Sequence, residues 1–494
     1  MRPALALVLI CAQSATAQIA FEDVSANLPE HVYQGDWEHF VGGGVAVLDC
    51  NGDARPDLFA AGGTAPARLF VNQGGMRFAD VSVPRLTGVT GAYPLDIDGD
   101  GWLDLFVLRV GANVVLQGGP DCRFKDVTTA WDIPVRDDWS TAFTAWWPSG
   151  FDRPVMAVGN YVDRHDPEGP FGTCDSHDLL FPGPDGWRAE TLGPGFCTLS
   201  MLAARDASGT LRLRISNDRH YYIREGFEQM YDPVEQRFLT EADGWPRVSL
   251  WGMGIASRDI TGDGRDEVML TSMGDQLMQI AQADGSYVAA PFSIGSYAQR
   301  PFTGGDGRPS TGWHAEFGDM DNDGRADLFI AKGNVDQMPG MAMLDPNNLL
   351  MQQPDGTFAE AADTAGLASM ARSRGAALAD FDGDGLLDVV VINRRAPMEL
   401  YRNVTPDAGG WLAVDIRAAG NTRLVGGMVR VTTPAGVQTQ QIVVGGGHAG
   451  GQAGPLHFGL GQAGTARVEV IGPDGAILHD AEHAAGAVMR LELR

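Results

Sequence analysis

Five short acidic loops recur along the chain, and each lies between two stretches that favour β-strands. They read DCNGDARPD (49–57), DIDGDGWLD (96–104), DITGDGRDE (259–267), DMDNDGRAD (319–327) and DFDGDGLLD (380–388). Ordinary turns need one Asp or Gly, whereas these loops repeat three or four acidic side chains at positions 1, 3, 5 and 9. A liganding pattern repeated between short strands constrains the chain to a repeating all-β fold.

The carboxylates within one loop repel one another, and a divalent cation is the simplest explanation for their spacing. Side chains at positions 1, 3, 5 and 9, a carbonyl from position 7 and a glycine at position 6 form an oxygen cage. An EF-hand loop closes with Glu at position 12, but here the ninth residue closes the cage and a strand follows. The flexible, oxygen-rich cage favours calcium over magnesium, and no His or Cys has the ligand spacing of zinc. The sequence predicts up to five calcium ions with a structural role.

The spacing of the loops predicts the number of repeating units. The loops begin at 49, 96, 259, 319 and 380, and the longest interval, from 96 to 259, is about three units long. Segments 144–163 and 201–218 align with the strand, loop and strand of their neighbours but lack the acids, which gives seven units in total. A second phrase also occurs seven times, as FEDVS (21–25), FADVS (78–82), FKDVT (124–128), WRAET (187–191), FLTEA (238–242), YVAAP (287–291) and FAEAA (358–362).

The first copy of this phrase precedes the first loop, and no copy follows the last unit, which ends at 398–403. An N-terminal strand that completes the last unit explains the offset and removes a free sheet edge. We therefore expect an all-β protein with a seven-bladed β-propeller over 18–405, closed by residues 21–25 in the blade of 375–403. Alternating strands with Gly and Pro turns predict a small C-terminal β-sandwich domain over 410–494.

The N-terminus has the pattern of a secretory signal peptide. An apolar run follows Arg2, and Ala15 and Ala17 form a cleavage pattern before Gln18, so residues 1–17 are the predicted signal peptide. A bulky isoleucine before Cys11 argues against a lipid anchor. No later apolar run reaches the roughly 20 residues of a membrane span. The sequence predicts a secreted or periplasmic protein.

Export would leave Cys50, Cys122, Cys174 and Cys197, an even number that favours disulfides in an oxidising compartment. Four cysteines allow three pairings. The pair Cys174–Cys197 is preferred because both residues lie in one long polar insertion, and Cys50–Cys122 is then the remainder.

The formal net charge of −27 argues against nucleic acid or an anionic membrane as a partner. The ligand positions of the five loops hold 18 of the acidic side chains. Five bound divalent ions would add ten positive charges and leave about −17. The acidity is therefore explained mostly by the predicted cation loops.

The chain resembles a known family, the FG-GAP/VCBS-type propellers of the ASPIC/UnbV (cartilage acidic protein-like) group. The resemblance is carried by the five loops, by GNYVD (159–163) before a cysteine-bearing insertion, by ISND (215–218) and WGMGIA (251–256), and by GGMVRV and LHFGLG near the C-terminus. It implies an exported calcium-binding propeller with an appended β domain. The segment GGGHAGGQAG (445–454) stands where relatives tend to carry a Ser/Tyr-containing stretch.

The resemblance also implies the metal ligands, which are side chains except for the carbonyls of Arg55, Trp102, Arg265, Arg325 and Leu386. The other ligands are Asp49, Asn51, Asp53, Asp57, Asp96, Asp98, Asp100, Asp104, Asp259, Thr261, Asp263, Glu267, Asp319, Asp321, Asp323, Asp327, Asp380, Asp382, Asp384 and Asp388. Departures from the family pattern are Ala54 for Gly, Asn51 and Thr261 for Asp, and Glu267 for the closing Asp. The loop 259–267 departs at two ligand positions and is the weakest of the five predicted sites.

The segments that enter the inner strands should lie at the mouth of the channel opposite the cation loops. They are rich in Trp, which suits sugar faces, and in Arg, which suits carboxylates, so one hypothesis is a glycan-binding rim. The alternative is that these aromatic residues seal the junctions between blades. The predicted rim residues are Trp37, His39, Trp139, Trp251, Trp313, His314, Arg372 and Arg374.

These features favour a non-enzymatic, monomeric binding or scaffold module for an extracellular or envelope protein or glycan. A calcium-dependent polysaccharide lyase is the alternative, since such an enzyme uses His, Tyr and Arg to abstract a proton beside a uronate. Candidate side chains for it are Arg164, His165, His177, Asp178 and Asp185, with Arg219, His220, Tyr221 and Tyr222. Their spacing matches no catalytic motif, so no catalytic residue is assigned.

Overall fold

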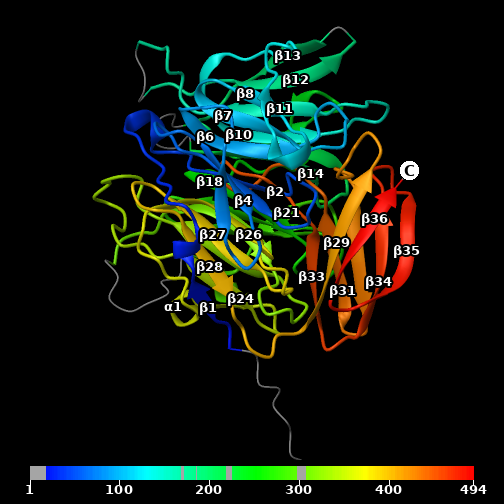
Figure 1. The fold of residues 1–494 in the computed structure, drawn as a ribbon. Coiled ribbons are helices and arrows are strands. Elements are labelled where there is room, and N and C mark those ends of the chain that lie inside the picture. The colour runs from blue at the N-terminus through cyan, green and yellow to red at the C-terminus, as the bar shows by residue number, and fades with distance from the viewer. Residues whose placement is uncertain (1–17, 168–171, 185, 219–224, 298–306, 494) are drawn as a thin grey trace, which may run out of the picture.

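The computed structural model describes residues 18–493 except 168–171, 185, 219–224 and 298–306 (Figure 1). The predicted signal peptide, residues 1–17, lies outside the described residues. The described chain is an all-β fold, and its one α-helix is α1 (Ala362–Ala365). Single 3-10 turns occur at η1 (Ser25–Asn27), η2 (Trp37–His39), η3 (Pro120–Cys122), η4 (Glu241–Asp243) and η5 (Phe292–Ile294). Within these residues, no helix combines the length and the apolar character that a membrane span requires.

Four-stranded antiparallel stretches repeat along the chain up to residue 403. In chain order they are β2–β5 (Val45–Leu48, Asp57–Ala60, Arg68–Asn72, Phe78–Val81), β6–β9 (Val89–Leu95, Asp104–Ala112, Val114–Gln117, Lys125–Asp126), β10–β13 (Asp137–Trp146, Val155–Asn160, His177–Gly183, Gly186–Leu192), β14–β17 (Thr198–Arg205, Leu211–Asn217, Gln229–Asp232, Arg237–Phe238), β18–β21 (Gly252–Arg258, Glu267–Ser272, Leu277–Ala281, Tyr287–Ala289), β22–β25 (Gly312–Gly318, Asp327–Lys332, Asn348–Gln352, Phe358–Glu360) and β26–β28 (Ser373–Ala379, Asp388–Asn393, Glu399–Asn403) with β1 (Phe21–Asp23). Each copy of the phrase that begins with FEDVS lies at the outer strand of one stretch, in β1, β5, β9, β13, β17, β21 and β25.

The N-terminal strand pairs with the last strand of this region. Phe21 lies opposite Asn403 in the antiparallel pair β1–β28, and the two strands lie side by side in Figure 1. The first strand of each stretch contacts the first strand of the next, from β2 through β6, β10, β14, β18 and β22 to β26. Strand β26 in turn contacts β2, although more than 300 residues separate them along the chain.

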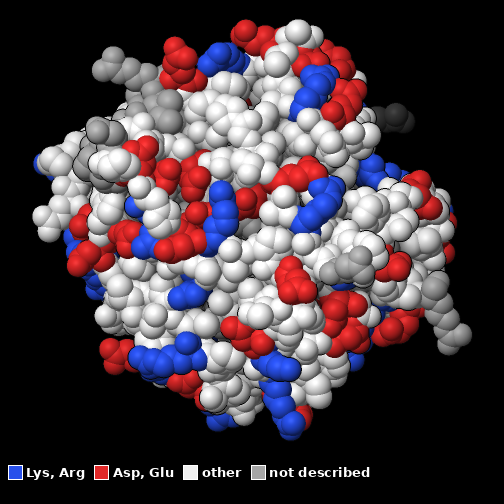
Figure 2. All heavy atoms as spheres, turned by 90° about the horizontal axis from the view of Figure 1, so that it is seen from above, with Lys and Arg blue, Asp and Glu red and all other residues white. Residues whose placement is uncertain are grey.

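The strands that follow the acidic loops form the buried interior of each stretch. All six residues of β27 are buried, and four of them are valine or isoleucine, whose branched side chains pack well on a pleated surface. The loops lie at one end of these strands. Loop 49–57 is partly exposed, whereas Asp319, Asp321 and Asn322 of loop 319–327 are buried. In the view of Figure 2, acidic and basic side chains are interspersed over the face, with no large basic patch.

The C-terminal region forms two further sheets, drawn in orange and red in Figure 1. Their orders are β33-β29-β36 and β31-β30-β34-β35. The strands are β29 (Gly410–Ala418), β30 (Met428–Thr433), β31 (Gly436–Gln441), β33 (Leu456–Gly461), β34 (Thr465–Ile471), β35 (Ile477–Ala484) and β36 (Ala487–Leu493). Val414 and Val468 of the two sheets share one buried cluster with Phe106 and Phe143 of β7 and β10. The C-terminal sheets therefore pack against the rest of the chain through a continuous apolar core.

One segment of the C-terminal region leaves its own sheets and enters the space between the first strands of the repeats. This segment, residues 443–453, is called the channel segment below. Its last residues form β32 (Gln452–Ala453), which pairs in parallel with β2. Single β-bridges join it to other first strands, namely Ala145–Val444, Leu202–Gly445, Ile255–Gly447 and Ala92–Gly450. It therefore ties β2, β6, β10, β14 and β18 together from the inside.

Candidate metal centres

Each acidic loop is folded around its first and last carboxylates. In loop 380–388, the N–H groups of Gly383 and Asp384 donate to Asp380 Oδ1 at 2.7 and 3.1 Å, and the Gly385 N–H donates to Oδ2 at 2.9 Å. The closing Asp388 accepts from the N–H of Phe381 at 2.9 Å and of Asn403 at 2.8 Å. The closing carboxylate thus joins the loop to the third strand of its own sheet.

The predicted position-7 residues occupy the same place in all five loops. The backbone N–H of Arg55, Trp102, Arg265, Arg325 and Leu386 donates to the Oδ1 atom of the position-5 aspartate, at 2.8 to 3.0 Å. The position-5 acceptors are Asp53, Asp100, Asp263, Asp323 and Asp384. The local conformation of the loop is therefore repeated together with its sequence.

In three loops, carboxylate oxygens from positions 1, 3 and 9 lie within 4.8 Å of one another. These groups are Asp96, Asp98 and Asp104; Asp319, Asp321 and Asp327; and Asp380, Asp382 and Asp388. In the other two loops, position 3 is the uncharged Asn51 or Thr261. The three loops with aspartate at position 3 concentrate more negative charge than the two loops with Asn51 or Thr261. A hard cation such as calcium stabilises such a group of carboxylates.

Two oxygen atoms in these loops are buried without a hydrogen-bond partner. They are Oδ1 of Asp321 and Oε1 of Glu267. A buried acceptor without a partner costs about 1–3 kcal/mol, and more when it is charged. A coordinated cation would satisfy both atoms, so the donor set fits calcium. Glu267 also takes the place of the closing aspartate, since its Oε2 accepts from the Ile260 N–H at 3.0 Å.

The electrostatics of the loops favour protonation when no cation is bound. Burial is the largest cause and raises the pKa of Asp57 to about 7 and that of Asp104 to about 8, with neighbouring loop carboxylates adding to the shift. Burial likewise raises the pKa of Glu267 to about 7 and the pKa of Asp388 well above its usual value. A cation that binds here must therefore displace protons.

Arginine side chains pair with the same carboxylates, which the sequence analysis missed. Arg265 contacts the position-5 Asp263 of its own loop at 2.7 Å, and Arg55 and Arg325 do the same in their loops. Arg402 of β28 contacts Asp382 at 2.6 Å and Asp384 at 3.1 Å. The sequence signal that could have indicated this role for Arg402 is its position in β28, the strand beside the loop 380–388. These pairs reduce the charge that a cation would meet.

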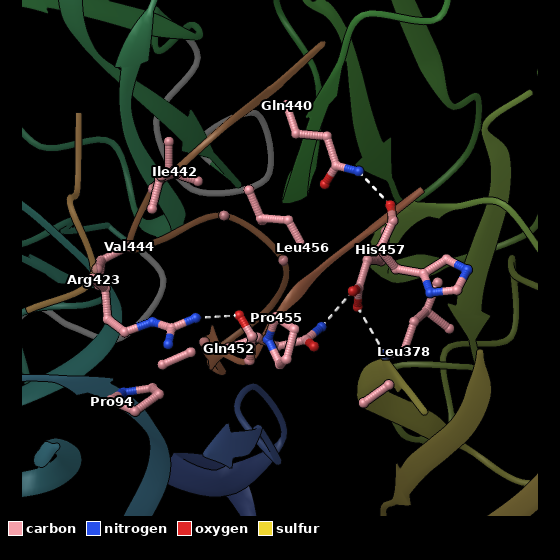
Figure 3. Close-up of a pocket in the computed structure, with 18 of the residues that line it drawn as sticks. Pro94, Leu378, Arg423, Gln440, Ile442, Val444, Gln452, Pro455, Leu456 and His457 are labelled. Atoms are coloured by element: carbon pink, nitrogen blue, oxygen red, sulfur yellow. Dashed lines mark hydrogen bonds between the residues drawn. The ribbon is translucent and has the colours of Figure 1, made fainter. Parts of the chain in front are cut away.

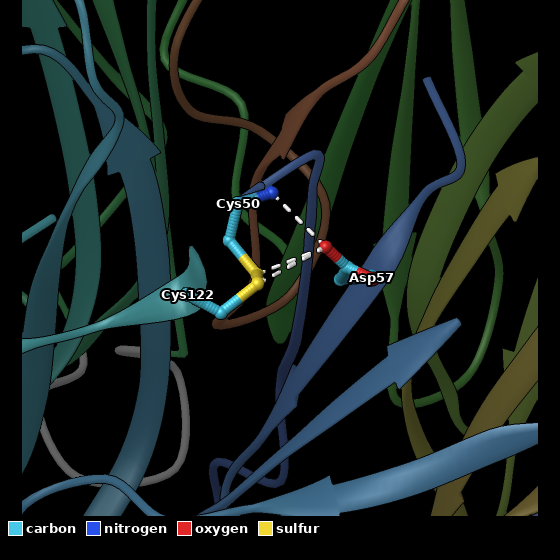
Figure 4. A group of neighbouring side chains, drawn as sticks. All are labelled: Cys50, Asp57 and Cys122. Carbon is cyan, nitrogen blue, oxygen red and sulfur yellow. Dashed lines mark hydrogen bonds between the residues drawn. A yellow bond between two sulfur atoms is a disulfide. The ribbon is translucent and has the colours of Figure 1, made fainter. Parts of the chain in front are cut away.

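The first loop is also held by a disulfide. Cys50, at position 2 of the loop, is bonded to Cys122, and its N–H donates to Asp57 Oδ2 at 3.0 Å (Figure 4). The two sulfur atoms are bonded to each other and are not metal ligands. The second bridge joins Cys174 and Cys197. The preferred pairing of the four cysteines is therefore confirmed.

The predicted rim residues are brought together, but most of them are buried. Trp139 and Arg374 are buried, and so is Trp313, whose ring lies under the Arg374 guanidinium at 4.0 Å. His39 and His314 are also buried. Trp37 is 39% exposed and packs edge-on against Trp139 at 6.1 Å, while Trp251 and Arg372 are half-buried. A ligand at this mouth could reach Trp37, Trp251 and Arg372 without rearrangement.

The channel segment lies below this mouth and is anchored by His448. The His448 N–H donates to His314 Nδ1 at 3.1 Å, and His314 Nε2 lies 3.2 Å from Glu316 Oε2. Gly42 N–H donates to His448 Nε2 at 3.3 Å, which leaves His448 Nδ1 to donate to the Met253 carbonyl at 3.3 Å. Burial lowers the pKa of His448 to about 3, so the ring stays neutral.

The residues considered for a lyase are not brought together. His177 is completely buried beside Thr198, and burial lowers its pKa to about 3. His165 is exposed, and Arg164 pairs with Glu38 at 2.9 Å. Asp178 contacts Arg136 at 3.2 Å. Asp185 and residues 219–222 lie outside the described residues. His165 Nε2 instead lies 3.9 Å from Asp137, and within the described residues no contact joins two of these candidate side chains.

Comparison with known proteins defines the class of this chain. The family model for FG-GAP-like repeats matches residues 49–107, 259–330 and 335–391, which include all five acidic loops. The model described as ASPIC and UnbV matches residues 417–491. This is a protein of FG-GAP-like repeats. The chain belongs to the family that combines these repeats with an ASPIC and UnbV domain.

Individual relatives are more distant. Cartilage acidic protein 1 of Mus musculus is 31% identical over 111 residues, which are 22% of this chain and 17% of that protein's length. The structure of BBS1N in complex with ARL6DN has a TM-score of 0.47 and 10% identity, covering 80% of this chain and 99% of the other. The structure of YCF48 bound to D1 peptide has a TM-score of 0.42 and 10% identity, with 79% and 99% covered.

Proposed function

We propose that this protein is an exported, calcium-stabilised β-propeller that acts as a monomeric, non-enzymatic binding or scaffold module for an extracellular or envelope protein or glycan. The observation that carries the proposal is the repeated acidic loop. Three copies gather carboxylate oxygens within 4.8 Å, and two buried oxygens in the loops have no partner. Side chains and carbonyls at positions 1, 3, 5, 7 and 9 of each loop would hold one ion, which would cross-link two strands of one sheet.

The propeller has seven blades in this proposal, and β1 closes the last one. The chain of contacts between first strands returns from β26 to β2, which supports a ring. Pairing of β1 with β28 supports the closing strand. The unit 18–405 would form the wheel and 410–494 the appended domain, with the channel segment as the link. Two disulfides support passage through an oxidising compartment.

The calcium sites can be counted one at a time. Asp321→Asn removes a carboxylate whose Oδ1 is buried without a partner, so we expect isothermal titration calorimetry to detect one ion fewer than in the wild type. The matched control is Asp355→Asn, because Asp355 is exposed in a turn outside the loops and accepts a hydrogen bond from Thr357. Equal ion numbers for wild type and Asp321→Asn would contradict the assignment of this loop.

Binding at the mouth opposite the loops can be tested with exposed residues only. Trp37→Ala should abolish glycan-array or partner binding and change the melting temperature little, because the ring is 39% exposed. Trp313 is unsuitable for this test, since its removal from a buried site costs about 3–5 kcal/mol. Phe151→Ala is the control, as Phe151 is 47% exposed in the turn at the other end of β10. Unchanged binding by Trp37→Ala would exclude this residue from the binding surface.

A further inference from the structure

A cavity of about 330 Å³ lies between the channel segment, the first strands of the repeats and the C-terminal sheets (Figure 3). Its walls are mainly aliphatic, with Leu202, Ile255, Leu378, Val414, Ile442 and Leu456 among the lining residues. Small-molecule sites in proteins have volumes of roughly 300–1,000 Å³ and apolar walls with a few polar groups. The size and the lining of this cavity therefore fit a small ligand.

Most polar groups on the wall are satisfied within the protein. Gln440 donates to the His457 carbonyl, and Gln452 donates to Glu316 (Figure 3). Arg423 pairs with Asp415 and donates to the Gly454 carbonyl, both at 2.5 Å. These groups shape the cavity but require nothing from a ligand.

Two further carboxylates border the cavity and are also partnered. Asp96 accepts from the N–H groups of Gly99 and Gly101 and from the Thr422 hydroxyl. Asp380 accepts from the backbone of its own loop. Both are predicted calcium ligands. Their negative charge disfavours a ligand that carries more than one negative charge of its own.

Arg258, at the end of β18, is the exception on this wall. The residue is one of those that line the cavity, and it is only 8% exposed. Within the part of the chain that the structure describes, its guanidinium makes no hydrogen bond and no ion pair. The guanidinium lies over the ring face of Phe458, 5.7 Å from the ring centre. Burial lowers the pKa of Arg258 to about 10, while the negative charges of Asp266, Asp319 and Asp259 act on it in the opposite direction. A buried guanidinium without a hydrogen-bonded partner is costly, and a carboxylate in the cavity would supply such a partner.

We propose that this cavity binds a small organic monocarboxylate with an apolar body, whose carboxylate pairs with Arg258. The planar guanidinium presents paired N–H donors that match a carboxylate. Aliphatic walls suit the rest of such a molecule, and Arg258, whose guanidinium has no hydrogen-bonded partner among the described residues, suits a single carboxylate. This inference does not depend on the surface around Trp37.

Octanoate is a suitable probe, with octanamide as its uncharged counterpart of the same shape. We expect isothermal titration calorimetry on the full calcium-loaded chain to detect octanoate and to give at least tenfold weaker binding of octanamide. Arg258→Met, which keeps much of the side-chain volume, should weaken octanoate binding at least tenfold and leave octanamide binding unchanged. Arg423→Met is the matched control, because Arg423 lines the same cavity but is already paired.

Melting curves identify a variant that fails to fold. If Arg258→Met fails to fold, Arg258→Lys provides the test. Lysine keeps the positive charge but lacks the planar guanidinium with its paired N–H donors, so this variant should bind octanoate several-fold more weakly than the wild type. Three results would overturn the proposal: no octanoate binding to the wild-type chain at millimolar concentration, equal binding of octanoate and octanamide, or unchanged octanoate binding by folded Arg258→Met or Arg258→Lys.

Discussion

Calcium will raise the melting temperature of this protein by roughly 8–10 °C at about pH 8 relative to chelator-treated protein. At a concentration tenfold above Kd, each ion that binds only the folded state adds about 1.4 kcal/mol, and five ions add about 7 kcal/mol. With an unfolding entropy of about 2.1 cal/mol/K per residue over residues 18–405, this sum of free energies corresponds to the expected rise in melting temperature. Extracellular calcium modules bind with Kd on the order of 10⁻⁴–10⁻³ M, so about 10 mM calcium is sufficient.

The same comparison at about pH 5.5 should give a smaller calcium effect. The folded-state pKa values of the loop acids are raised, to about 7 for Asp57 and Glu267 and about 8 for Asp104, so the folded protein without calcium holds extra protons. Binding of these extra protons stabilises the folded protein. This stabilisation is fully present below the unfolded-state pKa near 4 and is lost as the pH rises through the folded-state pKa values of about 7–8. Chelated protein is therefore expected to become less stable over this pH range, whereas calcium binding becomes stronger.

Thermal unfolding followed by circular dichroism at both pH values, with chelator or with calcium, measures these effects. Magnesium at the same concentration is the control, and it should stabilise less, because it demands a stricter geometry and retains water. If the melting curves with chelator and with calcium coincide at about pH 8, the loops hold no structural calcium, and the Arg55, Arg265, Arg325 and Arg402 pairs are the interactions that compensate their charge.

The C-terminal sheets lie against the loops, so calcium should also affect their docking. The Thr422 hydroxyl donates to Asp96, a predicted ligand, and the Gly409 N–H donates to the carbonyl of Asp321 at 2.9 Å. His457 Nε2 lies 2.7 Å from Asn322 Oδ1 in the same loop. A loop that loses its cation and expands would therefore disturb the contact with the C-terminal region.

Local patterns in the sequence predicted the local features of the fold. The all-β class and the position of each acidic loop follow from residue spacing and strand propensity, which depend on neighbours in the chain. The Cys174–Cys197 pair followed from the insertion that contains both residues, and Cys50–Cys122 followed as the remainder, although 72 positions separate its two cysteines. The sequence offered burial of Trp313 at a blade junction as the alternative to an exposed rim. It could not decide between the two, because burial depends on contacts with residues more than 100 positions away, such as His448. The sequence also shows that Arg402 neighbours the last loop, but not that its side chain points toward Asp382.

The insertion of residues 443–453 into the channel was missed for a similar reason. A segment that pairs with five different strands has no periodic pattern of its own. Its glycines, together with Gly91 of β6 and Gly44 directly before β2, were the available signal, since glycine in or beside a strand often marks a close approach of another backbone. The sequence analysis treated GGGHAGGQAG only as a departure from relatives, whereas the structure places it among the inner strands.

Gly91→Ala and Gly44→Ala will each destabilise the protein by about 3 kcal/mol or more. A methyl group on Gly91 would lie 1.7 Å from the Ala449 carbonyl oxygen, and one on Gly44 would lie 1.8 Å from the same atom. Overpacking of a core typically costs 1–3 kcal/mol, and here the obstacle is backbone, which cannot rotate away as a side chain can. The channel segment must shift, which strains the bond from the Ala92 N–H to the Ala449 carbonyl, 3.2 Å long.

Denaturant unfolding and limited proteolysis measure the two consequences separately. The loss of stability should appear as a lower unfolding midpoint, and displacement of the channel segment should appear as new cleavage within 443–453. Gly454→Ala is the matched control, because it adds the same methyl group just beyond this segment, where no atom lies within 4 Å. If Gly91→Ala and Gly454→Ala unfold at the same midpoint and resist protease equally, the segment is not packed tightly in the channel. The C-terminal region would then be attached by its sheets alone, and the cavity beside Arg258 would lose one of its walls.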